Sequence, residues 1–297
     1  MARYSPPMLA IPEREPSASR WATRAALFAF GILVAAAFLF RLFGLATPVA
    51  FNLAAVAMGV AGLSIAAAII AGAIIWHTGR PGTARVLFAV CLSLALLSVP
   101  LVYIMWVRDY PLISDVTTDF DTPPSLAAVA RLRGPGDNAV TYNRGRFADE
   151  QARAYPDIRP LAIERPVDEA YGLVMDAVKR LKMDIVADDA PDAEAGTPGA
   201  IEAVDRTLIM GLYEDVGIRV SGDGERARVD IRSASRFGSG DMGSNAERIR
   251  ALVKEIRARV DATTPTAEDT QKKKKAKPEK EDGPKSDRRR KSRDREQ

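Results

Sequence analysis

The sequence predicts a membrane protein with three N-terminal transmembrane helices, an α+β domain whose antiparallel sheet carries two helices on one face, and a disordered basic tail. Three observations predict this class. Residues 42–79 and 86–107 contain no Asp, Glu, Lys or Arg. Between residues 161 and 262, alternating apolar patterns are flanked by helical ones. Residues 271–297 carry 13 Lys or Arg and 6 Asp or Glu, a composition typical of disorder.

These patterns divide the chain into five parts. We expect a disordered leader (1–20), a transmembrane region (21–107), an extended Pro-rich linker (108–160), the α+β domain (161–262) and the Lys/Arg-rich tail (263–297). The linker is expected to wrap around the domain.

The first span begins with the apolar run 25–40 and reaches spanning length if Arg41 extends its charge to the interface. A cleaved signal peptide is the alternative, but no convincing small-x-small cleavage site follows, so a retained helix is expected. Residues 51–76 and 86–107 are the second and third spans. In the second span, Gly59 and Gly62 are expected to permit close helix contact.

The positive charges predict the orientation of the spans. The N-terminal segment and the loop between the second and third spans carry most of the nearby cations, namely Arg3, Arg14, Arg20, Arg24, Arg80 and Arg85. The first loop has only Arg41. We therefore expect a multi-pass protein of the bacterial inner (cytoplasmic) membrane, with a cytoplasmic N-terminus and a periplasmic domain. That location makes nucleic acid an unexpected partner.

The domain pattern predicts several short antiparallel strands between two amphipathic helices. The first helix follows Pro166, and the second follows the capping-box pattern Ser244-x-x-Glu247. Gly222-Asp223-Gly224 marks a hairpin turn. The expected strands are 161–164, 183–187, 201–204, 207–212, 216–220 and 227–231. With both helices on one face, the other face of the sheet is expected to be free for water or a partner.

The residue inventory excludes several kinds of chemistry. The chain has one Cys, Cys91, and one His, His77, so no intramolecular disulfide and no Cys/His zinc site can form. Catalysis by a Ser–His–Asp or Cys–His arrangement would need His77, at the end of an apolar segment. We expect no catalytic residue, no cofactor and no metal.

Motifs after the third span carry a family resemblance. Asp115-Val-Thr-Thr-Asp119 and Pro123-Pro124 are followed by Ile201-Glu-Ala-Val-Asp-Arg-Thr207 and Asp215-Val-Gly-Ile-Arg219. Then come Arg228-Val-Asp-Ile-Arg-Ser-Ala-Ser-Arg236, Gly238, Asp241, Gly243, Asn245 and Arg248-Ile249. Over about residues 109–260 the chain resembles the domain-of-unknown-function family 1499, often found as membrane-anchored bacterial proteins. The resemblance implies a domain type and no activity.

The same stretch supplies a candidate site for an anion or a lipid headgroup. Its residues are Arg232, Ser235, Arg236, Ser244, Asn245 and Arg248. Helix N-termini attract anions, and arginine binds phosphate or carboxylate in a bidentate manner. Arg232 and Ser235 are expected to project away from the buried face. The structural alternative is that Asp241 or Ser244 caps the helix and that Arg248 pairs with Asp241.

Two sets of acidic residues are candidates for other chemistry. Asp115, Asp119 and Asp121 are candidate calcium ligands, but their spacing matches no known loop, and capping and turn roles are favoured. Glu202, Asp205 and Asp215 are candidates for a hydrolase. On a strand, however, Glu202 and Asp205 would point to opposite faces.

The expected function is a non-catalytic, envelope-facing binding or interaction domain for a lipid or another hydrophobic or anionic ligand. The alternative is a scaffold subunit for another envelope protein, and a carboxylate-based hydrolase is the weaker alternative. The expected partners are the lipid bilayer and either a lipid ligand or an envelope protein. The basic runs 272–275 and 288–291 are solvated or attract anionic lipid. The sequence does not specify the oligomeric state.

Overall fold

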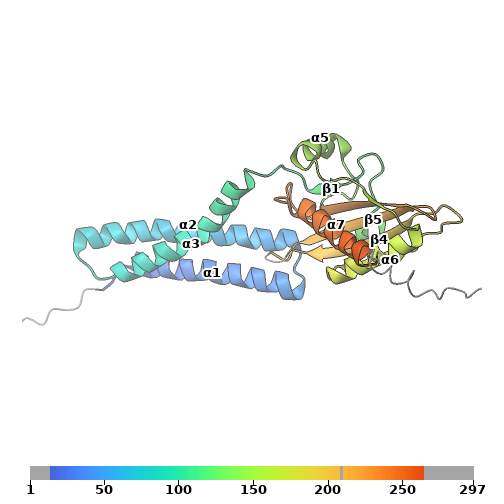
Figure 1. Cartoon of the computed structure of the whole chain (residues 1–297). Coiled ribbons are helices and arrows are strands. Elements are labelled where there is room, and N and C mark those ends of the chain that lie inside the picture. Colours follow the sequence, from blue (N-terminus) through green and yellow to red (C-terminus); the bar gives the residue numbers. More distant parts are fainter. Residues whose placement is uncertain (1–13, 208–209, 264–297) are drawn as a thin grey trace, which may run out of the picture.

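The computed structural model describes residues 14–207 and 210–263, in which a bundle of three helices adjoins an α+β domain (Figure 1). The helices are α1 (Ser17–Phe43), α2 (Thr47–Thr78) and α3 (Thr83–Val107). All three are long and apolar enough to cross a membrane, as the sequence predicted. Residues 17–20, expected in the leader, are helical. The rest of that leader up to residue 13, and the tail from residue 264, lie outside the described residues.

Alanine side chains form the contacts within the helix bundle. Ala26 and Ala68 are buried in one cluster with Ala89, and Ala61 is buried in a second cluster with Leu96. The Ser64 hydroxyl donates a hydrogen bond of 2.9 Å to the Ala22 carbonyl. The predicted contacts at Gly59 and Gly62 are wrong, because a Cβ atom added at either glycine would meet nothing within 4 Å. Small residues do allow close approach, but they are alanine and serine.

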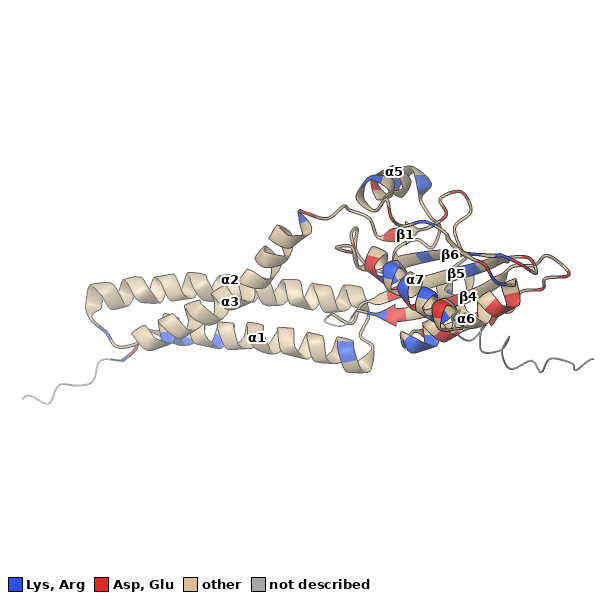
Figure 2. Ribbon diagram, in the orientation of Figure 1, with Lys and Arg blue, Asp and Glu red and all other residues tan. Residues whose placement is uncertain are grey.

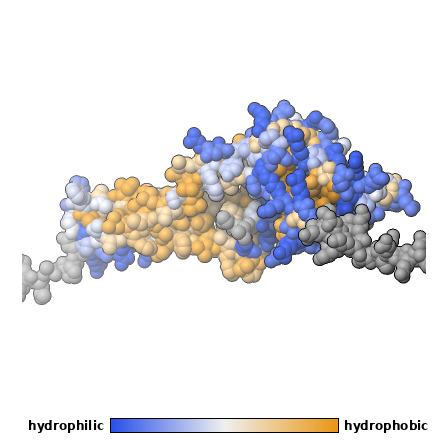
Figure 3. Space-filling model, in the orientation of Figure 1, coloured by the Kyte–Doolittle hydropathy of each residue, from blue (hydrophilic) through white to orange (hydrophobic). Residues whose placement is uncertain are grey.

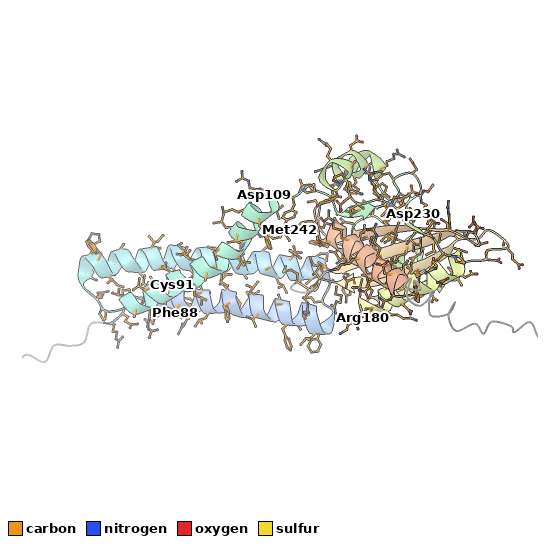
Figure 4. The ribbon with its side chains drawn as sticks, in the orientation of Figure 1. Phe88, Cys91, Asp109, Arg180, Asp230 and Met242 are labelled. Carbon is orange, nitrogen blue, oxygen red and sulfur yellow. The ribbon has the colours of Figure 1, made fainter. Side chains whose placement is uncertain are left out.

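The third helix changes direction near Pro100 and leaves the other two (Figure 1). Its buried residues, Ala89, Ser93 and Leu96, all precede this proline. Beyond it, Val102 and Trp106 are 61% and 60% exposed. Proline lacks the N–H group of the helical ladder and clashes with the preceding turn, which accounts for the bend. Cys91, labelled in Figure 4, is exposed on the first half of α3.

The two ends of the bundle differ in charge (Figure 2). The N-terminus of α1 and the α2–α3 loop lie at the end away from the domain (Figure 1), where Arg85 pairs with Glu15. The α1–α2 loop lies at the domain end, where Arg41 is in the last turn of α1. The structure therefore places the N-terminus of α1 and the α2–α3 loop at one end of the bundle and the domain at the other.

The domain rests on the end of the bundle that carries the α1–α2 loop. The rings of Phe51 in α2 and Phe237 stack with centroids 4.7 Å apart. Gly136 lies against Pro48, and Gly211 lies against Arg41. Figure 3 shows that the hydrophobic surface of the helices continues to this junction. The loops that contact the helices are those at one end of the sheet.

The sheet has six strands, and every pair is antiparallel. They are β1 (Asp115–Thr117), β2 (Leu161–Ile163), β3 (Asp184–Asp189), β4 (Gly199–Arg206), β5 (Tyr213–Gly222) and β6 (Ala227–Ser235). The order is β1-β6-β5-β4-β3, and β2 also pairs with β6. β1 and β2 therefore lie end to end along one edge, while β3 forms the other edge. The hairpin between β5 and β6 pairs Gly222 with Ala227 and points away from the bundle (Figure 1).

Two helices cover one face of the sheet, as predicted. They are α6 (Val167–Arg180) and α7 (Ser244–Thr263). Val174 of α6 and Ile249 of α7 pack in one buried core with Ile218 of β5 and Ile231 of β6. The periodicity of apolar residues predicted these helices because one stripe of each faces the sheet.

The other face of the sheet is covered, so the expectation that it is free was wrong. A Cβ atom at Gly217 in β5 would lie 2.4 Å from the Ser125 carbonyl oxygen. Leu126 and Val129 pack against Val204 and Ala234. The covering chain comes from residues 108–160, the expected linker, which adds β1, α4 (Ala127–Ala130) and α5 (Arg144–Ala154) to the domain. Because few long apolar runs occur there, composition alone did not reveal these elements.

The predicted strand at 207–212 is wrong for the described residues of that segment. Thr207 and residues 210–212 connect β4 to β5 without strand structure. The Thr207 hydroxyl accepts a hydrogen bond of 2.9 Å from the Leu212 amide, and Gly211 has a φ of +72°. A side chain that bonds the backbone locally favours a turn over a strand.

The alanine contacts predict an effect of helix overpacking. Ala61→Leu should destabilise the full chain by about 1–3 kcal/mol, because added methyl groups must push α1 and α3 away from α2. Ala66→Leu, on the exposed side of the same helix, should have little effect. Thermal unfolding of both variants in detergent measures the difference. Equal melting temperatures would contradict this helix packing.

Candidate functional site

The six residues of the predicted anion site lie on both faces of the sheet. On β6, Ser233 and Ser235 face α7, because both contact Asn245. Arg232 and Arg236 face the covering chain on the opposite side, where each pairs with a carboxylate. Ser235 therefore shares a face with Ile231, contrary to the expectation that it projects away from the buried face. The structure does not bring the six residues together into one site.

The N-terminus of α7 is capped by the Asp241 carboxylate and fastened to the sheet by the Asn245 side chain. Asp241 Oδ1 accepts from the Gly243 amide at 2.9 Å, and Asp241 Oδ2 accepts from the Asn245 amide at 2.8 Å. The side chain of Asn245 accepts from the Ser233 hydroxyl and donates to the Ser235 hydroxyl. Asp241 thus already accepts two of the N–H groups at this helix end that an anion would need. Burial raises the pKa of Asp241, although the hydrogen bonds from those amides oppose the shift.

The expected capping box does not form at this helix end. The Ser244 hydroxyl donates to the Glu214 carboxylate, and the cap is supplied by Asp241. Asp241 was one of the two residues expected from the sequence to cap this helix. Asp241 lies three residues before the helix begins, and the chain reaches back through Gly243, whose φ is +81°.

Arg248 joins α7 to two strands. Its Nε lies 2.7 Å from Asp205 Oδ2 in β4, and its Nη1 lies 2.7 Å from Glu214 Oε2 in β5. The predicted pairing of Arg248 with Asp241 is therefore wrong. Burial raises the pKa of Glu214, and the nearby Arg248 guanidinium opposes that shift. Two carboxylates already occupy this arginine, so it offers little to a further anion.

On the opposite face, Arg232 makes a bidentate contact with Asp115 of β1. The distances are 3.0 Å from Nε to Oδ1 and 2.7 Å from Nη2 to Oδ2. Nη2 also donates to the Val140 carbonyl, and the guanidinium lies 5.6 Å from the centroid of the Tyr142 ring. Both charged side chains are almost fully buried. The pair ties β1 to β6 and holds the covering chain against the sheet.

Asp215 of β5 lies between two arginines. Its side chain is 0% exposed, with Oδ2 2.8 Å from Arg133 Nη2 and Oδ1 2.7 Å from Arg236 Nη2. Arg133 also donates to the Asn138 carbonyl, and Arg236 donates to the Leu132 carbonyl. A buried ion pair is costly unless its hydrogen-bonding groups are satisfied, and these carbonyls each accept from one further donor of the two guanidinium groups.

A third group of charges lies farther from the helix bundle. Asp230 is fully buried and pairs with Arg219 at 2.8 Å and with Arg228 at 3.0 Å. Both arginines also contact Asp119. Figure 4 shows Asp230 within the sheet. This group joins the far half of β6 to the chain that follows β1.

The three aspartates that were candidate calcium ligands have other partners. Asp115 pairs with Arg232, Asp119 with Arg219, and Asp121 with Arg144. Asp119 Oδ1 also accepts the amides of Asp121 and Thr122, which is the turn role favoured by the sequence. Among residues 14–207 and 210–263, no group of three or more His, Cys, Asp or Glu side chains is placed to hold a metal ion.

The candidate hydrolase carboxylates do not converge. Glu202 accepts the amides of Ala128 and Val129, so it caps the short helix α4 on the covered face. Asp205 pairs with Arg248 on the helix face. Glu202 and Asp205 therefore point to opposite faces, as the strand pattern predicted. Asp215 is enclosed by its two arginines.

Two important polar residues were not predicted from the sequence. Gln151 of α5 is fully buried and pairs with the outer backbone of β1: its Oε1 accepts the Thr117 amide, and its Nε2 donates to the Thr117 carbonyl. Glu214 was also not singled out. An alternating strand pattern places Glu214 beside Val216 and Ile218 on the buried face, and a charge at such a position signals a buried partner.

Residues 115–256 match the family described as protein of unknown function (DUF1499). The match confirms the resemblance predicted from the sequence. We refer to these residues as the DUF1499 region. It begins with β1, which shows that the chain before residue 161 belongs with the sheet. A search of curated proteins gives no match.

The motifs that carried the resemblance now have structural roles. In the DUF1499 region, Arg232 and Arg236 bind Asp115 and Asp215, while Asn245 and Arg248 fasten α7 to the sheet. These contacts position helix, sheet and covering chain relative to one another. They also use the donors that the anion hypothesis required.

Removing the carboxylate at the centre of this network should be costly. Asp215→Asn leaves the buried Arg133 and Arg236 without their charged partner and should lower the free energy of unfolding by about 3–5 kcal/mol. Asp121→Asn removes an exposed ion pair and should cost less than about 1 kcal/mol. Thermal or denaturant unfolding of the full chain compares them. Similar stabilities would contradict a central role for Asp215.

Asp119 should give the stability a defined pH dependence. Burial acts to raise its pKa, but hydrogen bonds from Thr122, Asp121 and Arg219 outweigh this and lower the pKa from 3.8 to about 2. The charged form therefore stabilises the fold above about pH 4, and this contribution is lost as the pH falls toward 2. Asp119→Asn should cost about 2 kcal/mol at pH 7. Melting curves of both proteins should converge in acid, and a pH-independent difference would contradict this assignment.

Proposed function

We propose that this protein is a membrane-anchored, non-catalytic interaction module that acts as a scaffold for protein partners. The observation that carries the proposal is the pairing within the domain. Each arginine of the candidate anion site contacts at least one buried carboxylate. The charges that remain available for a partner lie on the exterior, along α7 and at the β3 edge. Such a surface suits protein recognition better than catalysis, which needs convergent polar groups in a cleft.

The positions of the hollows in the domain also favour the scaffold function over a lipid-carrier function. Two adjoining hollows, of about 780 and 420 Å³, lie on the outer side of α7 and beside β2. A carrier would need its chamber between the sheet and the helices. Ile218, Ile231, Ile249 and Leu252 instead fill that space as part of one buried core.

For the location, we propose the bacterial inner membrane with the domain in the periplasm. Arg20 and Arg24 of α1 and Arg80 and Arg85 near the α2–α3 loop lie toward the end away from the domain. The positive-inside rule assigns that end to the cytoplasm. The domain, together with the α1–α2 loop, then faces the periplasm.

A second candidate function is contact with lipid headgroups at the junction with the bundle. Leu132 and Met210 are 52% and 53% exposed in loops at the end of the sheet that rests on the helices. Arg206 is also exposed there and lies 4.4 Å from the centroid of the Tyr213 ring. Apolar and cationic side chains together favour the membrane surface. This contact would orient the domain and is compatible with a scaffold.

Site-specific crosslinking in living cells tests the scaffold proposal. A photoreactive amino acid replaces Ala258, which lines the larger hollow on α7, and a matched variant carries it at Val102 in the exposed half of α3. We expect protein adducts from position 258 and lipid adducts from position 102. Lipid adducts alone at position 258, or no protein adduct there while position 102 reacts, would overturn the scaffold proposal.

A further inference from the structure

The outer side of α7 forms a groove beside the edge strand β2. Its floor is apolar, with Ile158, Leu161, Ile249 and Val253 among its lining residues. Exposed cations stand around it, namely Arg159, Lys254 and Arg257. They outnumber its carboxylates, which are Asp261 and an Asp157 that already pairs with Arg250. Within the described chain, neither Lys254 nor Arg257 forms an ion pair. We call these residues the basic groove.

The neighbouring part of the same sheet edge is closed. Gln151 pairs with both backbone groups of Thr117 in β1, in the way that another strand would. β2 pairs with β6 on one side only. The unpaired side of β2 is therefore the open part of this edge. It lies beside the basic groove, in the half of the domain farther from the helix bundle.

The opposite edge of the sheet carries the complementary charge. Asp188 and Asp189 end β3, and Asp192 and Glu194 follow in the loop before β4. All four side chains are exposed, and within the described chain none forms an ion pair with Lys or Arg. We call residues 188–194 the acidic ridge. Asp192 Oδ1 accepts the amides of Glu194 and Ala195, which gives the ridge a defined turn.

The two surfaces lie at about the same height above the membrane. Leu161 pairs with Val229, which pairs with Val220, which in turn pairs with Gly199. Asp189 pairs with Ala200, the next residue of β4. The strands run toward and away from the helix bundle (Figure 1), so their two edges face sideways along the membrane. A second copy beside the first would present its acidic ridge to the basic groove at the matching height.

We propose that the acidic ridge of one copy docks against the basic groove of the next copy, side by side on the membrane. This inference rests on the proposed scaffold function and names a second copy of this chain as one partner. The contact is heterologous, because different surfaces of the two copies meet, so repetition produces an open row or a ring. Anchoring in the same bilayer raises the effective concentration of one copy near another.

Charge exchange between the two surfaces tests the inference. The groove variant carries Lys254→Glu and Arg257→Glu, and the ridge variant carries Asp188→Lys and Asp189→Lys. Full-length proteins are labelled at a cysteine introduced into an exposed loop of the domain, in a background with Cys91→Ala, and are reconstituted in phosphatidylcholine vesicles. Energy transfer between donor- and acceptor-labelled copies measures their association at matched surface density. Lys179→Glu with Arg180→Glu, on exposed residues of α6, is the matched control.

We expect association of the unaltered protein and of the control. Each altered protein alone should associate at least about tenfold more weakly, because like charges then face each other. An equimolar mixture of groove and ridge variants should regain association, because their altered surfaces are again complementary. Melting temperatures close to that of the parent establish that the variants are folded.

Three outcomes would overturn the inference. The first is no association of the parent above that expected for random mixing. The second is loss of association in the groove variant but not in the ridge variant, which would mean that an acidic segment other than the ridge occupies the groove. The third is failure of the mixture to regain association. In all three cases, protein adducts from position 258 in cells would still support a scaffold for other proteins, so the two proposals fail separately.

Discussion

The buried contact of Asp215 with Arg133 and Arg236 holds together parts of the domain that are distant in sequence. Asp215 lies in β5, Arg236 follows β6, and Arg133 lies in the chain that covers the sheet. If this contact were lost, the covering chain and the end of β6 nearest the membrane would lose their shared anchor. The position of the domain on the helix bundle depends on that end, because Phe237 follows Arg236 directly and stacks on Phe51.

The two faces of the sheet use different physical means for the same purpose. Toward α6 and α7, burial of aliphatic side chains such as Ile231 and Ile249 supplies the stabilising energy. On the covered face, ion pairs dominate, and apolar packing is limited to a small cluster around Leu126 and Val129. Ion pairs demand defined geometry, so they fix the path of an irregular chain that apolar packing alone would leave less specified. A polar network of this kind can define a fold without forming an active site.

The sequence predicted those parts of the fold that have strong periodicity. The three apolar helices, α6, α7 and the β5–β6 hairpin follow directly from the spacing of apolar residues. β1, α4 and α5 did not, because each is short and is stabilised by contacts with distant residues, such as Asp115 with Arg232 and Gln151 with Thr117. The candidate site drew attention to important arginines but not to their partners. Which carboxylate an arginine contacts depends on strand register, and the sequence does not state the register.

The length of α2 has a consequence for the membrane itself. Its 32 residues extend about 48 Å at the helical rise, whereas the hydrocarbon core of a bilayer is about 30 Å thick. A helix longer than the core tilts or thickens the surrounding lipid. Because the domain contacts the first turns of α2 through Phe51, a tilt of the bundle inclines the domain as well. If α2 spans a bilayer, the thickness of that bilayer would then set how steeply the sheet stands above its surface.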